Sequence, residues 1–166
     1  MAPTNGNEPR WLSPEEQRAW RVFLYTTTRL REALSQALEQ DPEVSLTLAE
    51  YEILVRLSEA PGGHARMSEL ADHVVHSRSR LTHTVTRLEK RGLVERQRCA
   101  SDGRGREALL TADGRALLER AAPVHVASVR AQLVDPLGTD GMVRLGSLLS
   151  ALLTEDERAE IAATPE

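Results

Sequence analysis

Residues 77–110 change their pattern three times in a fixed order, and this order restricts the possible folds more than any other feature of the chain. Ser77 is a helix-capping residue, and Leu81, Val85 and Leu88 recur after it at helical spacing. Gly92 can end that helix because glycine adopts the left-handed conformation without strain. Residues 93–99 then alternate as a strand does, a polar glycine-rich turn follows at 100–106, and residues 108–110 predict a return strand.

Positive charge is concentrated in the same part of the chain. Residues 76–106 carry nine basic and three acidic residues, whereas the whole chain has a net charge of −4. Such a basic element inside an acidic protein is typical of nucleic-acid binding. When the apolar residues of the helix are buried, its other face presents arginines and short hydroxyls, which suit a DNA major groove. We expect this face to contact DNA through Arg78, Ser79, Arg80, Thr82, His83, Thr86 and Arg87.

A short helix expected at 68–74 precedes the basic helix. The order of helix, helix, strand, basic turn and strand is that of a winged helix-turn-helix, in which the strands and their turn form the wing. The fold class we expect is therefore mainly α with a small β-wing, flanked by N- and C-terminal dimerisation helices.

Local signals predict the flanking helices. The sequences SPEE at 13–16 and TLAE at 47–50 are capping boxes that start helices, with Leu46 and Tyr51 placed as a hydrophobic staple at the second. Asp41-Pro42 should end the first helix, and residues 61–63 the second. The first helix has an apolar stripe of Trp20, Phe23, Leu24, Leu30, Leu34 and Leu38.

The C-terminal part predicts a long helix followed by an apolar one. Thr111 caps a helix that should continue past Pro123 to residue 133, and Asp135-Pro136 with Gly138 should break it. Residues 143–153 then form a strongly apolar helix. The two terminal regions carry more apolar surface than one small head can cover, so we expect it to be buried against a second subunit.

Four sequence blocks resemble the MarR family of transcriptional regulators. They are MSELA at 67–71, SRLTHTVTRLEKRGLVER at 79–96, SDGRGR at 101–106 and LTADG at 110–114. The resemblance implies a single MarR-type domain at 13–153, with dimerisation helices at 13–40 and 111–153 and a winged head at 46–110. We expect residues 1–12 to be a disordered arm and residues 154–166 a frayed C-terminal tail.

The resemblance also implies a function and further site residues. Arg104 would enter the minor groove, Arg106 would be a further DNA contact, and Asp102 would support the wing tip. The expected protein is a homodimeric repressor on a pseudo-palindromic operator, with recognition helices about 34 Å apart. A small, often aromatic molecule would relieve repression, and Trp20 and Tyr51 are candidates to contact it, although each could instead pack the interior.

Several alternatives stay open at this stage. Cys99, the sole cysteine, could sense oxidation at the base of the wing beside Arg96 and Arg98, or could be a small apolar residue. Zinc binding by His64, His73, His76 and His83 lacks obvious third and fourth ligands, so no metal or cofactor is expected.

Function classes other than DNA binding have little support in the sequence. The winged helix could be a protein-association module without sequence-specific DNA binding. An enzyme is not expected, because the chain has no glycine-rich cofactor loop, nucleophile elbow or paired-carboxylate motif. No apolar run is long enough for a membrane span and the first ten residues are polar, so we expect a cytoplasmic protein.

Overall fold

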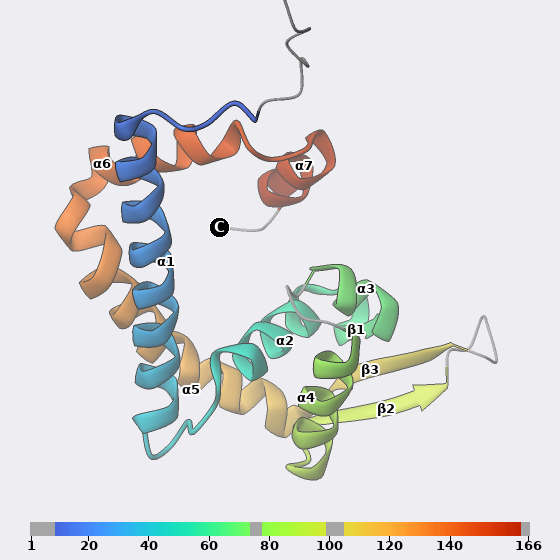
Figure 1. Cartoon of the computed structure of the whole chain (residues 1–166). Coiled ribbons are helices and arrows are strands. Elements are labelled where there is room, and N and C mark those ends of the chain that lie inside the picture. Colours follow the sequence, from blue (N-terminus) through green and yellow to red (C-terminus); the bar gives the residue numbers. More distant parts are fainter. Residues whose placement is uncertain (1–8, 74–77, 99–104, 164–166) are drawn as a thin grey trace, which may run out of the picture.

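The computed structural model describes residues 9–73, 78–98 and 105–163. The described part is mostly helical with one small antiparallel sheet, which confirms the predicted fold class. Helices α2, α3 and α4 gather around the sheet to form the head, and α1, α5 and α6 extend from one side of it (Figure 1). The elements are α1 (Pro14–Gln40), α2 (Leu48–Glu59), η1 (Pro61–Gly63), β1 (His64–Arg66), α3 (Met67–His73), α4 (Arg78–Lys90), β2 (Val94–Arg98), β3 (Arg106–Leu110), α5 (Ala112–Val129), η2 (Arg130–Val134), α6 (Asp135–Ser150) and α7 (Glu155–Ala163).

Both predicted capping boxes are confirmed. At the start of α1, the Ser13 hydroxyl accepts a hydrogen bond from the Glu16 amide, and the Glu16 carboxylate accepts one from the Ser13 amide. Thr47 and Glu50 make the same reciprocal pair at the start of α2. These bonds satisfy amides that have no partner inside the helix.

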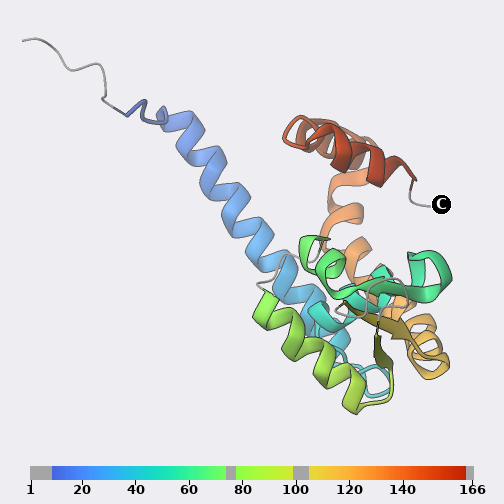
Figure 2. The ribbon, with the colours of Figure 1, turned by 90° about the vertical axis from the view of Figure 1, so that its right-hand side faces the viewer.

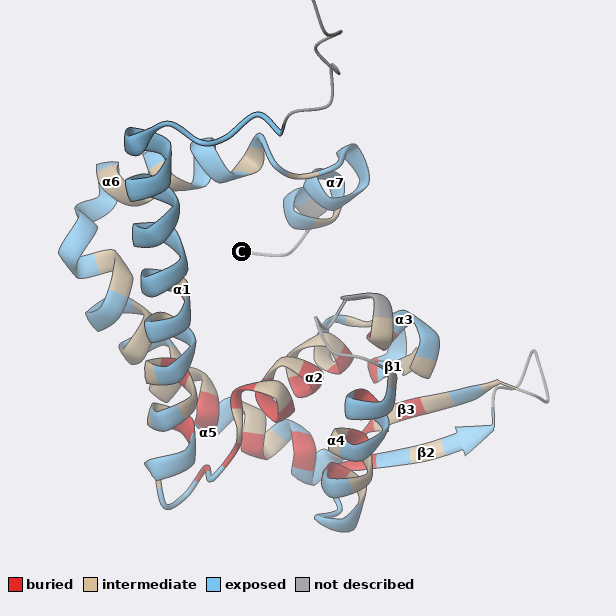
Figure 3. Cartoon of the chain, viewed as in Figure 1, coloured by how far each residue is buried: buried red, intermediate tan, exposed pale blue. Residues whose placement is uncertain are grey.

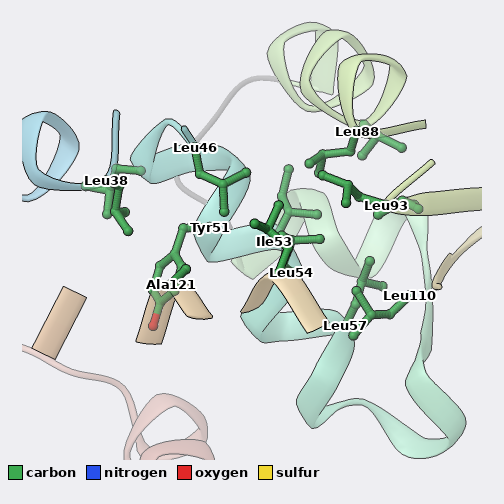
Figure 4. Close-up of a cluster of buried hydrophobic side chains, with 14 of the residues drawn as sticks. Leu38, Leu46, Tyr51, Ile53, Leu54, Leu57, Leu88, Leu93, Leu110 and Ala121 are labelled. Atoms are coloured by element: carbon green, nitrogen blue, oxygen red, sulfur yellow. The ribbon is translucent and has the colours of Figure 1, made fainter. Parts of the chain in front are cut away.

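Helix α2 is the centre of the hydrophobic core. Ile53, Leu54 and Leu57 are completely buried, and the helix packs against α1, α5, α4 and strand β3 (Figures 3 and 4). The core continues into the other elements through Leu38, Leu46, Leu88, Leu93, Leu110 and Ala121. Because this cluster joins α1, α2, α4, α5 and the sheet, the head and the base of the flanking helices fold around one core.

The sheet has the strand order β1-β3-β2, with β3 antiparallel to both neighbours. Strands β2 and β3 confirm the predicted wing strands, whereas β1 was not predicted. A three-residue strand has too few residues to show alternation, and its pairing of Ala65 with Ala108 joins segments distant in sequence.

Gly92 ends α4 as predicted, with a φ of 73°. The Leu93 amide bonds to the Leu88 carbonyl at 3.0 Å, and the Gly92 amide to the Glu89 carbonyl at 2.9 Å. This is a Schellman arrangement, and it directs the chain from the end of α4 into the first wing strand. The predicted cap at Ser77 lies outside the described residues.

The C-terminal helices are divided differently from the prediction, and the last apolar helix spans Asp135–Ser150 where residues 143–153 were expected. Helix α5 is capped by Thr111 and passes Pro123 as expected, but Asp135-Pro136 does not interrupt the helical path. The chain instead forms the short π-helical segment η2, in which the Asp135 amide bonds to the Arg130 carbonyl, and Pro136 lies in the first turn of α6. Proline is accommodated there because the π-helical segment before it already replaces the regular i→i−4 hydrogen-bond pattern. The expected break is at Gly138 alone, where φ is 67°.

The region expected to be a C-terminal tail, residues 154–166, contains a further helix. Residues Glu155–Ala163 form helix α7, which Thr154 and Glu157 cap in a third box. Glu160 of α7 makes an ion pair with Arg56 near the end of α2. The cap and this distant ion pair stabilise a segment whose side chains are mostly exposed.

The flanking helices leave a large apolar surface uncovered in the single chain. The N-terminal half of α1 stands clear of the head and is coloured as exposed, and most of α6 is coloured as exposed (Figures 2 and 3). Of the predicted stripe on α1, only Leu34 and Leu38 are buried. Exposed apolar residues on the two helices include Trp20, Phe23, Leu24, Val143, Leu148 and Leu149. Within the described ranges, no helix combines the length and the apolarity that crossing a membrane requires.

Candidate nucleic-acid interface

Helix α4 is held by one face and presents the other to solvent. Leu81, Val85 and Leu88 are buried in the core, as their spacing predicts. The residues predicted to contact DNA on the opposite side are exposed at Ser79, Arg80, Thr82, His83 and Arg87, and partly exposed at Thr86. The buried leucines and valine therefore orient a row of hydrogen-bond donors outward.

Two threonine hydroxyls on α4 donate back to their own helix. Thr86 Oγ1 donates to the Thr82 carbonyl at 2.8 Å, and Thr84 Oγ1 donates to the Arg80 carbonyl at 3.0 Å. Thr86 was predicted to contact DNA, and in this arrangement its hydroxyl oxygen can only accept a further hydrogen bond.

The end of the wing strands next to the turn places two arginines opposite each other. Arg98 of β2 and Arg106 of β3 are partners in the strand register, and both are exposed. Like charges directly opposite on a sheet repel each other, so this pair favours a bound anion. Arg106 was a predicted contact, whereas Arg98 was missed because only the strand register shows that the two face each other. Arg104 and Asp102, the predicted wing contact and its support, lie outside the described residues, as does Cys99.

A salt bridge joins the wing to the recognition helix. Arg96 of β2 donates from Nε to Glu89 Oε2 at 2.9 Å, and its Nη2 donates to the same oxygen. The hydrogen bond from Arg96 holds the pKa of Glu89 below its ordinary value. The sequence indicated Arg96 only as a neighbour of Cys99, and the structure gives its charge a carboxylate partner.

Arg87 has a protein partner that the sequence did not predict. Its Nη2 lies 3.0 Å from Oε1 of Glu50, a carboxylate at the start of α2 that is 1% exposed. Arg91, the residue directly after α4, donates to the carbonyls of Ser45 and Val44 in the loop before α2. These contacts fix the C-terminal half of α4 against α2 and the preceding loop.

The two residues proposed for ligand contact are not brought together. Trp20 lies on the exposed half of α1 and stacks on Phe23, with ring centroids 5.9 Å apart. Tyr51 is 8% exposed in the core and contacts the ring of His125, with ring centroids 4.5 Å apart. Burial, with the charge of Glu59, raises the pKa of Tyr51, and burial lowers the pKa of His125.

Two hollows lie along α1, and neither Trp20 nor Tyr51 lines them. One of about 520 Å³ is lined by residues of α1 between Arg21 and Glu32. The other, of about 330 Å³, lies between α1 and the segment from Ala131 to Pro136. Among the described residues, no three His, Cys, Asp or Glu side chains form a group that could hold a metal ion.

Comparison with known proteins gives consistent matches to one family. The model of the MarR family matches residues 46–105. The chain is 39% identical over 110 residues to the HTH-type transcriptional repressor Rv2887 of Mycobacterium tuberculosis, a match covering 64% of this chain and 76% of that protein.

Two solved structures from Streptomyces coelicolor match over most of their length. The MarR family regulator Sco3205, determined in complex with DNA, has a TM-score of 0.81 and 41% identity, covering 89% of this chain and 91% of that chain. The MarR family regulator AbsC has a TM-score of 0.79 and 42% identity, covering 87% of this chain and 95% of that chain.

Proposed function

The chain belongs to the MarR family of transcriptional regulators, and on that premise we propose that it is a sequence-specific repressor that binds double-stranded DNA as a homodimer. Family members regulate transcription through DNA binding and are not enzymes, in agreement with the lack of catalytic motifs in the sequence. Such a regulator acts where the DNA lies, and we place it in the cytoplasm.

The exposed face of α4 is the observation that carries this proposal. Leu81, Val85 and Leu88 are buried on one side, so Arg80 and His83 project from the side that a major groove would receive. Arginine can bind a guanine edge through two hydrogen bonds, and hydroxyl and imidazole groups adapt to several bases. Arg78 begins the same helix and would extend this surface at its N-terminal end.

The wing supplies a second contact region. Arg98 and Arg106 form an exposed cationic pair at the end of the wing strands next to the turn, which suits the phosphates flanking the groove. Arg104, at the tip, is proposed to enter the adjacent minor groove, with Asp102 orienting the turn. Two such regions in each subunit would make binding strongly dependent on salt, because each phosphate contact releases a counterion.

The uncovered apolar residues of α1 and α6 support the homodimer. Leu148 is 74% exposed and Val143 is 68% exposed in the single chain. Large exposed apolar patches of this kind mark protein interfaces. A two-fold dimer through these helices would present two α4 helices to successive major grooves and would require a roughly palindromic operator.

Relief of repression by a small, often aromatic molecule is also part of the proposal. The hollows beside α1, about 520 and 330 Å³, are in the size range of small-molecule sites. Trp20 also lies on α1 and is half exposed, whereas the burial of Tyr51 favours a packing role for that residue. A molecule bound beside α1 would act by changing the spacing of the two α4 helices.

The test is to incubate the purified protein with fragmented genomic DNA at two salt concentrations and to sequence the recovered fragments. Enrichment of a short palindrome, weaker at the higher salt concentration, is the expected result. Uniform recovery of all fragments would contradict sequence-specific binding. Absence of recovery at both salt concentrations would favour the alternative, a winged-helix module for protein association.

A further inference from the structure

Only one of the two carboxylate oxygens of Glu50 takes part in the cap of α2. Its Oε2 accepts hydrogen bonds from the Thr47 amide at 2.9 Å and from the Thr47 hydroxyl at 3.1 Å, which completes the capping box. Its Oε1 is buried and, among the described residues, accepts no hydrogen bond of good geometry. That oxygen faces the guanidinium of Arg87, with Nη2 3.0 Å away.

Arg87 is the countercharge that this buried oxygen faces. A carboxylate that is 1% exposed is costly without a nearby cation. Arg91 also approaches Glu50, but at 3.8 Å and from the side of Oε2, and its donors are directed to the carbonyls of Ser45 and Val44. The two arginines therefore have different partners. Arg91 donates its hydrogen bonds to the loop before α2, whereas Arg87 is directed to the carboxylate of Glu50.

The Arg87 side chain meets Glu50 at one nitrogen and is otherwise largely open to solvent. It is 60% exposed, and it belongs to the face of α4 that includes Arg80 and His83. An arginine side chain has many rotamers, and fixing it in advance lowers the entropy lost on binding. A fixed carboxylate behind it would keep the remaining N–H donors directed outward.

We propose that Glu50 is a positioning residue for the DNA contact of Arg87, one that acts without touching DNA itself. Glu50 holds one side of the guanidinium, and the open side binds a guanine edge or a phosphate of the operator. This inference rests on the proposed DNA-binding function. Glu50 would thus contribute to the affinity for the operator although it lies on α2, outside the recognition helix α4.

Glu50→Gln isolates this function from the helix cap. Glutamine also completes capping boxes, so α2 should still begin at the same residue. In the glutamine variant the side-chain oxygen must take the Oε2 position, because the cap needs an acceptor there. The side-chain NH2 group then takes the Oε1 position and faces Arg87, so that two hydrogen-bond donors oppose each other. Glu52→Gln is the matched control, because it makes the same chemical change two residues away on α2, where the carboxylate pairs with Arg31 of α1 at 3.5 Å.

The experiment measures the binding of two fluorescent duplexes, one selected by the wild-type protein from a randomised library and one scrambled duplex of the same composition. We expect Glu50→Gln to weaken binding to the selected duplex about tenfold or more. Binding to the scrambled duplex should be unchanged if Arg87 contacts a base edge, and weakened to a similar extent if Arg87 contacts a phosphate. Glu52→Gln should behave as wild type. Thermal unfolding of each variant verifies that it is folded.

A double-mutant cycle separates positioning from a general structural effect. In an Arg87→Ala background, Glu50→Gln should cause no further loss of binding, because the residue through which it acts is gone. If the affinity lost in Glu50→Gln depends on the base at one symmetric position of the operator, Arg87 contacts a guanine. If binding by the variant instead becomes less dependent on salt, Arg87 contacts a phosphate. Either result supports positioning.

Three results would overturn the inference: wild-type binding by Glu50→Gln, tighter binding by that variant, or an equal further loss in the Arg87→Ala background. Tighter binding would mean that Glu50 competes with DNA for Arg87. The proposed function itself fails in a different way, namely if the wild-type protein does not distinguish selected from scrambled DNA.

Discussion

Replacing Gly114 by alanine should destabilise the protein, although helix propensity alone predicts the opposite. Gly114 is in the first turn of α5, and alanine is preferred to glycine in a helix by up to about 1 kcal/mol. A Cβ at this position, however, would lie 2.1 Å from the Leu93 carbonyl oxygen and 2.7 Å from Leu110 Cδ1. The structure therefore predicts a clash that reverses the sign of the effect.

The expected magnitude follows from what must move. The Leu93 carbonyl also accepts a hydrogen bond from the Thr111 amide at 3.2 Å, and the Thr111 hydroxyl donates to the Gly92 carbonyl at 2.7 Å. Relieving the clash costs about 1–3 kcal/mol for overpacking, and loss of one of these bonds adds about 1 kcal/mol. After subtraction of the gain in helix propensity, Gly114→Ala should lower the free energy of unfolding by roughly 1–3 kcal/mol.

Urea and thermal unfolding at a fixed protein concentration measure this change. A loss of this size corresponds to a fall in Tm of roughly 2–10 °C for a chain of this length. Asp113→Ala, at the exposed neighbouring position, is the control and should change the free energy by no more than about 0.5–1 kcal/mol. A higher Tm for Gly114→Ala would refute the close approach of α5 to the wing.

Three further predictions concern the dimer, pH and the wing. Leu148→Glu, on the exposed face of α6, should convert the dimer to a monomer in analytical ultracentrifugation, because a charge cannot be buried there unpaired; a stable dimer would exclude this face from the interface. Burial lowers the pKa of His125 below its ordinary 6.5, so the unfolded chain binds more protons and stability from this residue is lost as pH falls below 6.5. His125→Phe, which keeps the ring contact with Tyr51, should therefore reduce the slope of unfolding free energy against pH in that range, and an unchanged slope would contradict the assignment. Arg104→Ala should weaken binding to all duplexes and remove a preference for A·T flanks, since narrow minor grooves attract arginine; unchanged affinity and flank preference would refute the wing contact.

The sequence predicted those parts of the fold that are determined locally. The capping boxes at Ser13 and Thr47, the left-handed Gly92 and the cap at Thr111 each depend on bonds between residues a few positions apart. Such bonds leave a readable spacing in the sequence. The starts of α1, α2 and α5 and the end of α4 therefore followed from residue types alone.

Elements that depend on distant partners were missed. Strand β1 exists through its pairing with β3, and the ion pair between Arg56 and Glu160 links α7 to α2 across most of the chain. Asp135-Pro136 misled the prediction for a different reason. Proline stops a helix when it breaks a regular i→i−4 hydrogen-bond pattern. Before Pro136 the π-helical segment has already replaced that pattern, so the helical path continues.

The candidate site shows the same division between local and distant information. The periodicity of Leu81, Val85 and Leu88 predicted which face of α4 is exposed, and the structure agrees. The contact between Glu50 and Arg87 could not be predicted, because the capping pattern already explained Glu50 and nothing in the sequence relates α2 to one side of α4. The arginine pair of the wing likewise required the strand register.

The most direct test of the account is the binding of the protein to three duplexes: the selected palindrome, the same palindrome with its half-sites moved apart by about half a helical turn, and a scrambled sequence. A homodimer with two fixed α4 helices should bind the first most tightly, bind the second little better than the third, and lose affinity for all three as salt is raised. Equal affinity for the three duplexes, or affinity that does not respond to salt, would contradict a dimeric, sequence-specific DNA-binding repressor.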